Sequence, residues 1–303
     1  MKRLHKLAFG TLASASLLAG CAQPVAQPTA YRPHQGKVQV LASVRVWAQI
    51  AAQLGGSAVL STAVISNANQ DPHSYETTVR DQLAVNLADI TIANGGGYDH
   101  FFSQLIGRKP NPSKGMELNL FAAQYGKGTK SANPHIWYSP VMAGNAAKLI
   151  AAAETRALPN RATEITKNLA RFESALSAME VRTTKATRTN SGKTALLTEN
   201  FAQPLIRALG ITDKTPAAVY NAVEAGDDLS PKIMAKIQSQ LAAGQFSIVI
   251  LNTQTESAQT SRIANWARQA GIPVVAMAET LPEGTTYLRW MAANLNKIER
   301  AVK

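Results

Sequence analysis

Four side chains that can bind a metal ion lie in the segments that follow predicted β-strands. They are His73, His135, Glu199 and Glu279, which follow the predicted strands at 59–65, 118–121, 195–197 and 274–277. A proline precedes each histidine and restricts the backbone next to the imidazole. Two imidazoles and two carboxylates form a nitrogen and oxygen donor set that suits Mn(II), Fe(II) or Zn(II), and the carboxylates neutralise a divalent cation. The residue types therefore favour a site for one such ion.

The case for a metal site depends on these four residues meeting in space. In parallel sheets, ligands bind outside the carboxyl ends of the strands, where loops converge on a crevice. Taken singly, a histidine at a strand end is more often a hydrogen-bonded loop residue, and a glutamate there more often supports a helix N-terminus. Asn252, Thr253 and Gln254 follow another predicted strand, at 247–251, and can face the same crevice as hydrogen-bond partners of the ligands.

The pattern of apolar residues predicts strands and helices that alternate on either side of one long helical stretch. Strands are expected at 38–41, 59–65, 90–93, 118–121, 195–197, 218–220, 247–251 and 274–277. Helices are expected at 46–54, 78–86, 100–105, 140–157, 161–187 and 286–302, and others are expected to begin near Phe201, Pro231 and Ala258. This alternation is typical of βα units around mainly parallel sheets.

The fold class that follows is α/β, with two lobes whose mainly parallel β-sheets are flanked by helices. We expect an N-terminal metal-binding lobe at 37–158, one long rigid linking helix at 159–190 and a C-terminal metal-binding lobe at 191–303. Each lobe supplies two of the four candidate ligands, so the ion would lie between them. The long helix would restrict hinge motion to small rocking.

The N-terminal segment has the features of an export signal. Residues 1–20 begin with positive charges and continue with an apolar run, which is the layout of a secretory signal peptide. Leu18-Ala19-Gly20-Cys21 resembles the bacterial lipoprotein signal, in which the cysteine is lipidated. The alternative is an ordinary signal peptide with an incidental cysteine. We expect a lipidated Cys21, a flexible tether at 21–36, and an extracytoplasmic chain anchored to the cell membrane.

Composition and missing motifs exclude several other function classes. The 303 residues carry 31 Lys and Arg against 19 Asp and Glu, a formal net charge of +12, but the basic residues are scattered, so no nucleic-acid partner is expected. Cys21 is the only cysteine, which excludes an intrachain disulfide and a multi-thiolate metal site. Gly95-Gly96-Gly97 lacks the spacing of a dinucleotide-binding loop, and no GxSxG motif occurs.

Several motifs together resemble one known family. The motifs Asp71-Pro72-His73-Ser74-Tyr75-Glu76, Asn133-Pro134-His135-Ile136-Trp137, Thr198-Glu199 and Glu279 resemble the metal-ligand positions of the cluster-9 solute-binding lipoproteins of metal ABC transporters. The resemblance covers nearly the whole mature chain and implies two α/β lobes around one interlobe metal ion, held by these two histidines and two glutamates. It implies a binding protein, not an enzyme, that delivers manganese, zinc or iron to a membrane permease. We expect a monomer.

Two departures from the zinc-type relatives favour manganese. Those relatives place a third histidine where Glu199 stands, and many carry a His/Asp-rich loop before the second histidine, whereas residues 122–132 here include no histidine or acidic residue. Zinc binds such a donor set at least as tightly as manganese on the Irving–Williams order, so selectivity must come from geometry. We favour Mn²⁺ as the cargo, with Zn²⁺ and Fe²⁺ as alternatives.

Two other functions fit the same residues. An extracytoplasmic metallohydrolase would use the histidines and one glutamate as ligands and the other glutamate as general base, with an open position for water. A surface adhesin would carry a structural metal site. Capture and delivery is the favoured hypothesis, because four protein ligands leave little room for a substrate.

Overall fold

A computed structural model describes residues 36–67, 70, 72, 75–111, 113, 115–129 and 132–303. The predicted signal peptide at 1–20, Cys21, the tether up to residue 35 and the candidate ligand His73 lie outside the described residues. The described residues belong to one compact unit, Pro33–Lys303. Within the described ranges, no helix is both long enough and apolar enough to cross a membrane.

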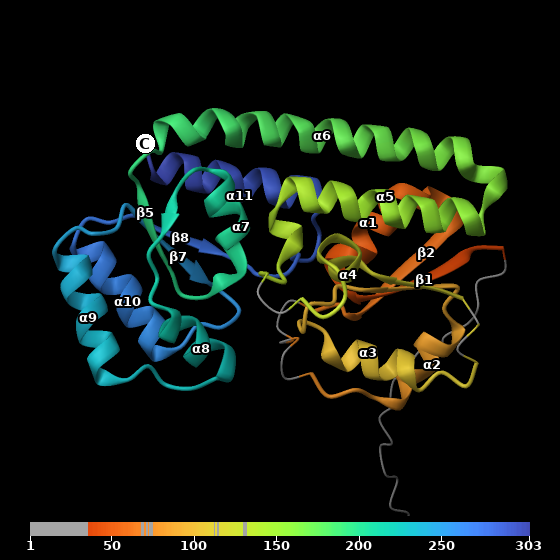
Figure 1. Cartoon of the computed structure of the whole chain (residues 1–303), viewed down its shortest axis with the longest axis horizontal. Coiled ribbons are helices and arrows are strands. Elements are labelled where there is room, and N and C mark those ends of the chain that lie inside the picture. Colours follow the sequence, from red (N-terminus) through yellow and green to blue (C-terminus); the bar gives the residue numbers. More distant parts are fainter. Residues whose placement is uncertain are drawn as a thin grey trace, which may run out of the picture. The chain divides into compact units, whose positions relative to one another are not determined.

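The first sheet consists of four parallel strands. They are β1 (Val38–Val44), β2 (Val59–Ile65), β3 (Ile90–Ala93) and β4 (Met116–Asn119), in the order β2-β1-β3-β4. The connecting helices are α1 (Arg45–Gly55), the 3-10 turn η1 (Gly56–Ala58), α2 (Val79–Leu87) and α3 (His100–Gly107). Val40 of β1 pairs with Ser61 on one side and Ile90 on the other. All carboxyl ends therefore lie at one edge of the sheet, as Figure 1 shows.

The strand predicted at 118–121 is wrong in its last two residues. β4 ends at Asn119, and α4 (Leu120–Tyr125) begins directly after it. The Asn119 side chain accepts a hydrogen bond from the backbone N–H of Ala122 (2.8 Å) and so caps the helix. Because this cap satisfies a free N–H group of the first turn, the apolar residues that follow continue as a helix.

Two long helices follow the first sheet. α5 (Pro140–Ala157) begins as predicted, with Ser139 as the N-cap and proline at the first helical position. The 3-10 turn η3 (Pro159–Arg161) then leads into α6 (Ala162–Thr189), which has 28 residues. α6 packs against α1 and α5 beside the first sheet and against α7 and α11 beside the second, and Figure 1 shows it running past both sheets. This helix is the predicted link between the lobes.

The second sheet repeats the parallel arrangement of the first. Its strands are β5 (Thr194–Leu197), β6 (Thr212–Asp213), β7 (Ile248–Asn252) and β8 (Val274–Met277), in the order β6-β5-β7-β8. Its helices are η4 (Asn200–Ala202), α7 (Gln203–Ala208), α8 (Ala217–Ala225), α9 (Pro231–Ala242), α10 (Ala258–Gln269) and α11 (Tyr287–Ala301). The predicted α/β fold class, with two sheets and one long helix, is confirmed.

The strand predicted at 218–220 is wrong, because these residues lie in helix α8. Alanine, the best helix former, supplies four of its nine residues, AAVYNAVEA, and outweighs the β-propensity of Val219 and Tyr220. Gly226 ends the helix in the left-handed conformation (φ 70°), which glycine adopts without a steric penalty. The edge strand beside β5 is instead the two-residue β6.

One hydrophobic cluster continues from the first sheet to the second. It contains the fully buried Trp47 of α1, Phe172 of α6 and Tyr287 of α11. Phe172 stacks on Tyr287 with ring centroids 5.8 Å apart. Burial of a phenylalanine side chain contributes about 1.5–3 kcal/mol, so α6 is bound firmly to α11. The shared core supports the expectation of restricted hinge motion, and the lobe boundaries at 37–158, 159–190 and 191–303 stay a prediction.

Candidate metal centre

His135 lies in the connection between α4 and α5, directly before the 3-10 turn η2 (Ile136–Tyr138). Asn133 Oδ1 accepts a hydrogen bond from the backbone N–H of His135 (2.8 Å) and lies 2.9 Å from the ring Nδ1. The amide nitrogen of Asn133 donates to the backbone oxygen of Asn200 (2.8 Å), which fixes the orientation of the amide. In the neutral ring the proton is therefore on Nδ1, and the lone pair on Nε2 is available to a cation.

Glu199 lies two residues after β5 and is held by residues of the neighbouring strand and loop. Its Oε2 accepts hydrogen bonds from Asn252 Nδ2 (2.6 Å) and Thr255 Oγ1 (2.7 Å). Thr198, just before it, accepts a hydrogen bond at Oγ1 from the backbone N–H of Asn252 (3.0 Å). The pairing of β5 with β7 thus determines where the carboxylate lies.

Glu279 lies two residues after β8 and contacts both sheets' loops. Its Oε1 accepts a hydrogen bond from the Tyr98 hydroxyl (2.7 Å) and lies 3.3 Å from His135 Nε2. Its Oε2 accepts one from Asn252 Nδ2 (3.2 Å). The backbone is fixed as well, because Trp137 Nε1 donates to the Glu279 carbonyl oxygen (3.0 Å). Glu279 therefore joins the two sheets through its side chain and its backbone.

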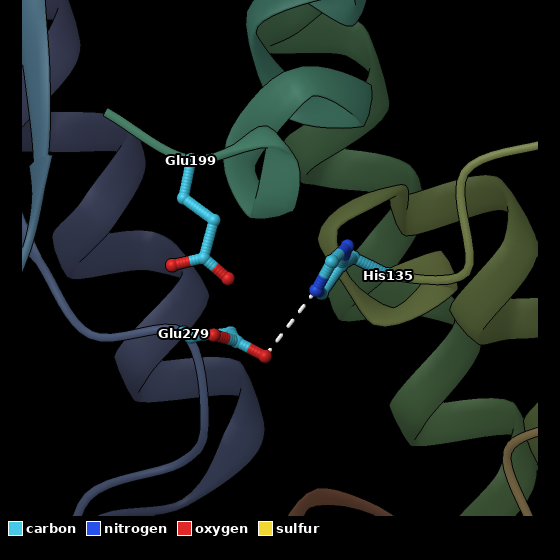
Figure 2. A group of neighbouring side chains, drawn as sticks. All are labelled: His135, Glu199 and Glu279. Carbon is cyan, nitrogen blue, oxygen red and sulfur yellow. Dashed lines mark hydrogen bonds and ion pairs between the residues drawn. The ribbon is translucent and has the colours of Figure 1, made fainter. Parts of the chain in front are cut away.

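Three of the four predicted ligands come together. One donor atom from each of His135, Glu199 and Glu279 lies within 4.8 Å of the other two. The residues are only 1%, 1% and 3% exposed, respectively. Figure 2 shows the imidazole and the carboxylates from three different elements turned towards one another. Metal–ligand bonds are about 2.0–2.2 Å long for nitrogen and oxygen, so small side-chain shifts would bring these atoms around one ion.

The two carboxyl groups have opposite pKa shifts. Burial raises the pKa of Glu199 to about 8, and the adjacent Glu279 charge adds to the effect. Burial acts on Glu279 too, but hydrogen bonds and charge from His135 and the Tyr98 hydroxyl outweigh it and lower its pKa to about 2. Near neutral pH the pair therefore carries one proton and one negative charge. A divalent cation would displace that proton.

Sequence reasoning missed Tyr98. Burial and the neighbouring carboxylates keep its pKa well above the ordinary value, so its hydroxyl remains a hydrogen-bond donor to Glu279. The Gly95-Gly96-Gly97 turn, all three with positive φ, brings it there. Asp99 accepts hydrogen bonds from the backbone N–H groups of Asn94 (2.6 Å) and Gly95 (2.8 Å) and holds the turn. The glycine turn was recognisable in the sequence, but its partner, 181 positions away, was not.

The predicted hydrogen-bond partners are found in part. Asn252 contacts both carboxylates. Among the described residues, Gln254 bonds Thr280, through its Nε2 to Oγ1 (2.8 Å) and its Oε1 to the backbone N–H (2.7 Å). Thr253 donates its hydroxyl to the backbone oxygen of Met277 (3.3 Å). Thr255, which sequence reasoning did not select, is a direct partner of Glu199.

The structure has two parallel α/β sheets linked by one long helix, with a buried His/Glu group between them. Solved structures share the fold. The periplasmic zinc binding protein TroA from Treponema pallidum matches with a TM-score of 0.74 and 15% identity, over 88% of this chain and 99% of that one. The solute-binding protein FpvC from Pseudomonas aeruginosa, in complex with Mn²⁺, matches with a TM-score of 0.72 and 18% identity, over 88% and 98%.

A periplasmic metal binding protein from Candidatus Liberibacter asiaticus matches with a TM-score of 0.68 and 18% identity, over 88% of this chain and all of that one (100%). Residues 40–301 match the family model described as zinc-uptake complex component A, periplasmic, and the chain belongs to this family. It is thus a metal-binding solute-binding protein of an extracytoplasmic uptake system and not an enzyme. The metallohydrolase alternative is therefore wrong.

Proposed function

We propose that this chain captures one divalent transition-metal cation between its two lobes and delivers it to the membrane permease of an ABC importer. His135, Glu199 and Glu279 would be ligands, and His73, which lies outside the described residues, would be the fourth. The observation that carries the proposal is the convergence of the first three within 4.8 Å at a buried position. They come from the loop before η2 and from the ends of β5 and β8.

The hydrogen bonds around these residues support a role in binding. Asn133 presents Nε2 of His135 as an acceptor, which is what a metal ligand requires. Tyr98 and Asn252 donate to the carboxylates and leave other lone pairs on Glu279 free. A buried pair of carboxyl groups without a cation is unfavourable, since one of them must stay protonated. A dication removes that penalty, and this difference gives the site its affinity.

The cellular setting of the proposal comes from the N-terminal segment. We propose that residues 1–20 are removed as a signal peptide, that Cys21 is lipidated, and that residues 21–36 tether the lobes to the membrane surface. A monomer would act there, with lobes at 37–158 and 191–303 around the linking helix at 159–190. Release would involve small rocking and local loop movement.

Mn²⁺ is the favoured cargo on the donor types. Two carboxylates and only two imidazoles make a harder set than one with three histidines, and carboxylate oxygen suits manganese. Zn²⁺ and Fe²⁺ are the alternatives. A competition titration of the purified chain with buffered Mn²⁺ and Zn²⁺ decides between these cations. Under the proposal, the chain binds one equivalent of metal, and it retains Mn²⁺ when the free Zn²⁺ concentration is held low.

Metal analysis of chain purified without chelator tests the capture step. We expect one equivalent per chain for the wild type and loss of nearly all of it for His135→Ala and Glu199→Ala. Matched controls are His100→Ala and Glu256→Ala, which change exposed residues outside the site and should keep one equivalent. His73→Ala tests the fourth ligand in the same assay. Full metal content in Glu199→Ala would contradict the proposed site.

Metal uptake by cells that carry each variant tests the delivery step. Uptake should fall in parallel with the metal content of His135→Ala. Normal uptake and normal binding in His73→Ala would favour the adhesin alternative, in which the metal is structural.

A further inference from the structure

One oxygen of Glu199 is fully used by hydrogen bonds within the chain. Oε2 accepts from Asn252 Nδ2 at 2.6 Å and from Thr255 Oγ1 at 2.7 Å. A carboxylate oxygen has two lone pairs, so two donors at these distances fill both positions. Figure 2 shows the two oxygens diverging, with one turned towards Glu279 and His135 and the other turned away.

The two donors are themselves held in place. Asn252 is the last residue of β7 and is fully buried. Its Oδ1 accepts a hydrogen bond from the backbone N–H of Gln254 (3.0 Å), so its Nδ2 must be the atom that faces the carboxylates. Thr255 lies three residues later, in the loop between β7 and α10. We call the pair Asn252 and Thr255 the carboxylate clamp.

Glu279 is held differently. Its two outside donors are divided between its oxygens, with Tyr98 on Oε1 (2.7 Å) and Asn252 on Oε2 (3.2 Å). The remaining neighbour of Oε1 is His135, which is itself a proposed ligand. Each oxygen of Glu279 therefore keeps a lone pair for a cation, whereas only one oxygen of Glu199 does.

We propose that the carboxylate clamp restricts Glu199 to a single oxygen towards the cation and thereby determines which cations the site prefers. This inference rests on the proposed function, since it takes Glu199 as a ligand. Asn252 and Thr255 are positioning residues, because they touch the ligand and not the ion. Thr255 is the more informative of the two, since its hydroxyl bonds only Glu199 among the residues that the structure describes, while Asn252 Nδ2 donates to both carboxylates.

The preference follows from the number of ligands each cation needs. Zinc sites are four-coordinate, whereas manganese in oxygen-rich sites takes about six ligands. A one-oxygen Glu199 keeps the number of protein donors low. The clamp therefore favours zinc relative to a site in which Glu199 offers both oxygens, and it opposes the manganese preference that the donor types give.

Thr255→Val tests the clamp, because valine keeps the shape of threonine and removes one donor from Oε2. Dissociation constants for Zn²⁺ and Mn²⁺ are measured by competition with a chromophoric chelator. Loss of such a donor typically weakens metal binding 10–100-fold. We expect the zinc affinity to fall by about tenfold, and the ratio of the manganese to the zinc dissociation constant to fall by at least threefold. Zinc X-ray absorption should show one more oxygen neighbour.

Two variants serve as controls. Thr253→Val makes the same change in the same loop, at a hydroxyl that bonds the Met277 backbone and not a carboxylate, and it should leave the ratio at the wild-type value. Thr255→Ser keeps the hydroxyl and should restore the ratio, which separates the lost donor from any loss of folding.

A change of less than threefold in the ratio for Thr255→Val, even if both affinities fall together, would overturn the clamp proposal. Such a result would mean that the hydroxyl only supports the loop. Failure of the wild-type chain to bind either metal would instead overturn the proposed function. The two failures are therefore distinguishable in one experiment.

Discussion

A buried carboxyl group far along α5 from the metal centre sets a measurable pH dependence of stability. Glu154 is 0% exposed, and neither of its side-chain oxygens has a hydrogen-bond partner within the part of the chain that the structure describes. It lies against Gly55 at the end of α1: a Cβ atom built there would be 3.1 Å from Glu154 Oε2. Burial raises the pKa of Glu154 from 4.5 to about 8. We predict that Glu154→Met stabilises the protein.

The sign and size follow from proton linkage. The pKa of Glu154 is higher in the folded chain than in the unfolded chain, so the folded state binds the proton more tightly. The resulting contribution to the free energy of unfolding is complete below about pH 4.5 and is lost as the pH rises through about 8. Between pH 5 and pH 8 the loss amounts to about 3 kcal/mol. Methionine has no proton to lose and fills nearly the same volume. The gain in unfolding free energy from Glu154→Met should therefore grow by about 3 kcal/mol over this range.

Urea unfolding at pH 5, 6, 7 and 8 measures this difference. The variant and wild type share all other titrating groups, so only the difference between them reports on Glu154. Glu173→Met is the matched control, since Glu173 forms a partly exposed ion pair with Lys148 (3.3 Å). Its effect should stay within about 1 kcal/mol at every pH. A pH-independent difference for Glu154→Met would refute the reasoning, because it would mean that the carboxyl stays ionised in the fold.

Three further predictions concern the site and the anchor. Asn133→Ala removes the group that orients the His135 ring and should weaken metal binding about 10–100-fold, measured by chelator competition; an unchanged affinity would show that the ring needs no such support. Because the pKa of Glu199 is raised to about 8, metal binding at pH 7 should release about one proton and affinity should fall with falling pH. Calorimetry in buffers of different ionisation enthalpy measures this, and zero release would contradict it. Cys21→Ala should move the protein from the membrane to the soluble extracytoplasmic fraction, and membrane retention would count against lipidation.

Local signals in the sequence were enough to predict most of the fold. The strand at 90–93 and the helix at 140–157 have the predicted bounds, because a continuous apolar run defines the first and Ser139 followed by proline defines the start of the second. The errors arose where a local helix signal outweighed the β-propensity of the same residues. Asn119 caps a helix in place of two strand residues, and an alanine-rich segment forms a helix in place of the strand at 218–220.

The candidate ligands were also accessible from the sequence, since residue type and position after a predicted strand pointed to His135, Glu199 and Glu279. In the structure, however, helix α4 separates His135 from β4. How they are held was not accessible. Tyr98 reaches Glu279 across 181 positions, and Asn252 reaches Glu199 across 53. Hydrogen bonds of this kind depend on the packing of two sheets against a shared core. Periodicity and capping act over a few residues and determine the elements, whereas the direction of each lone pair is decided only when distant elements meet.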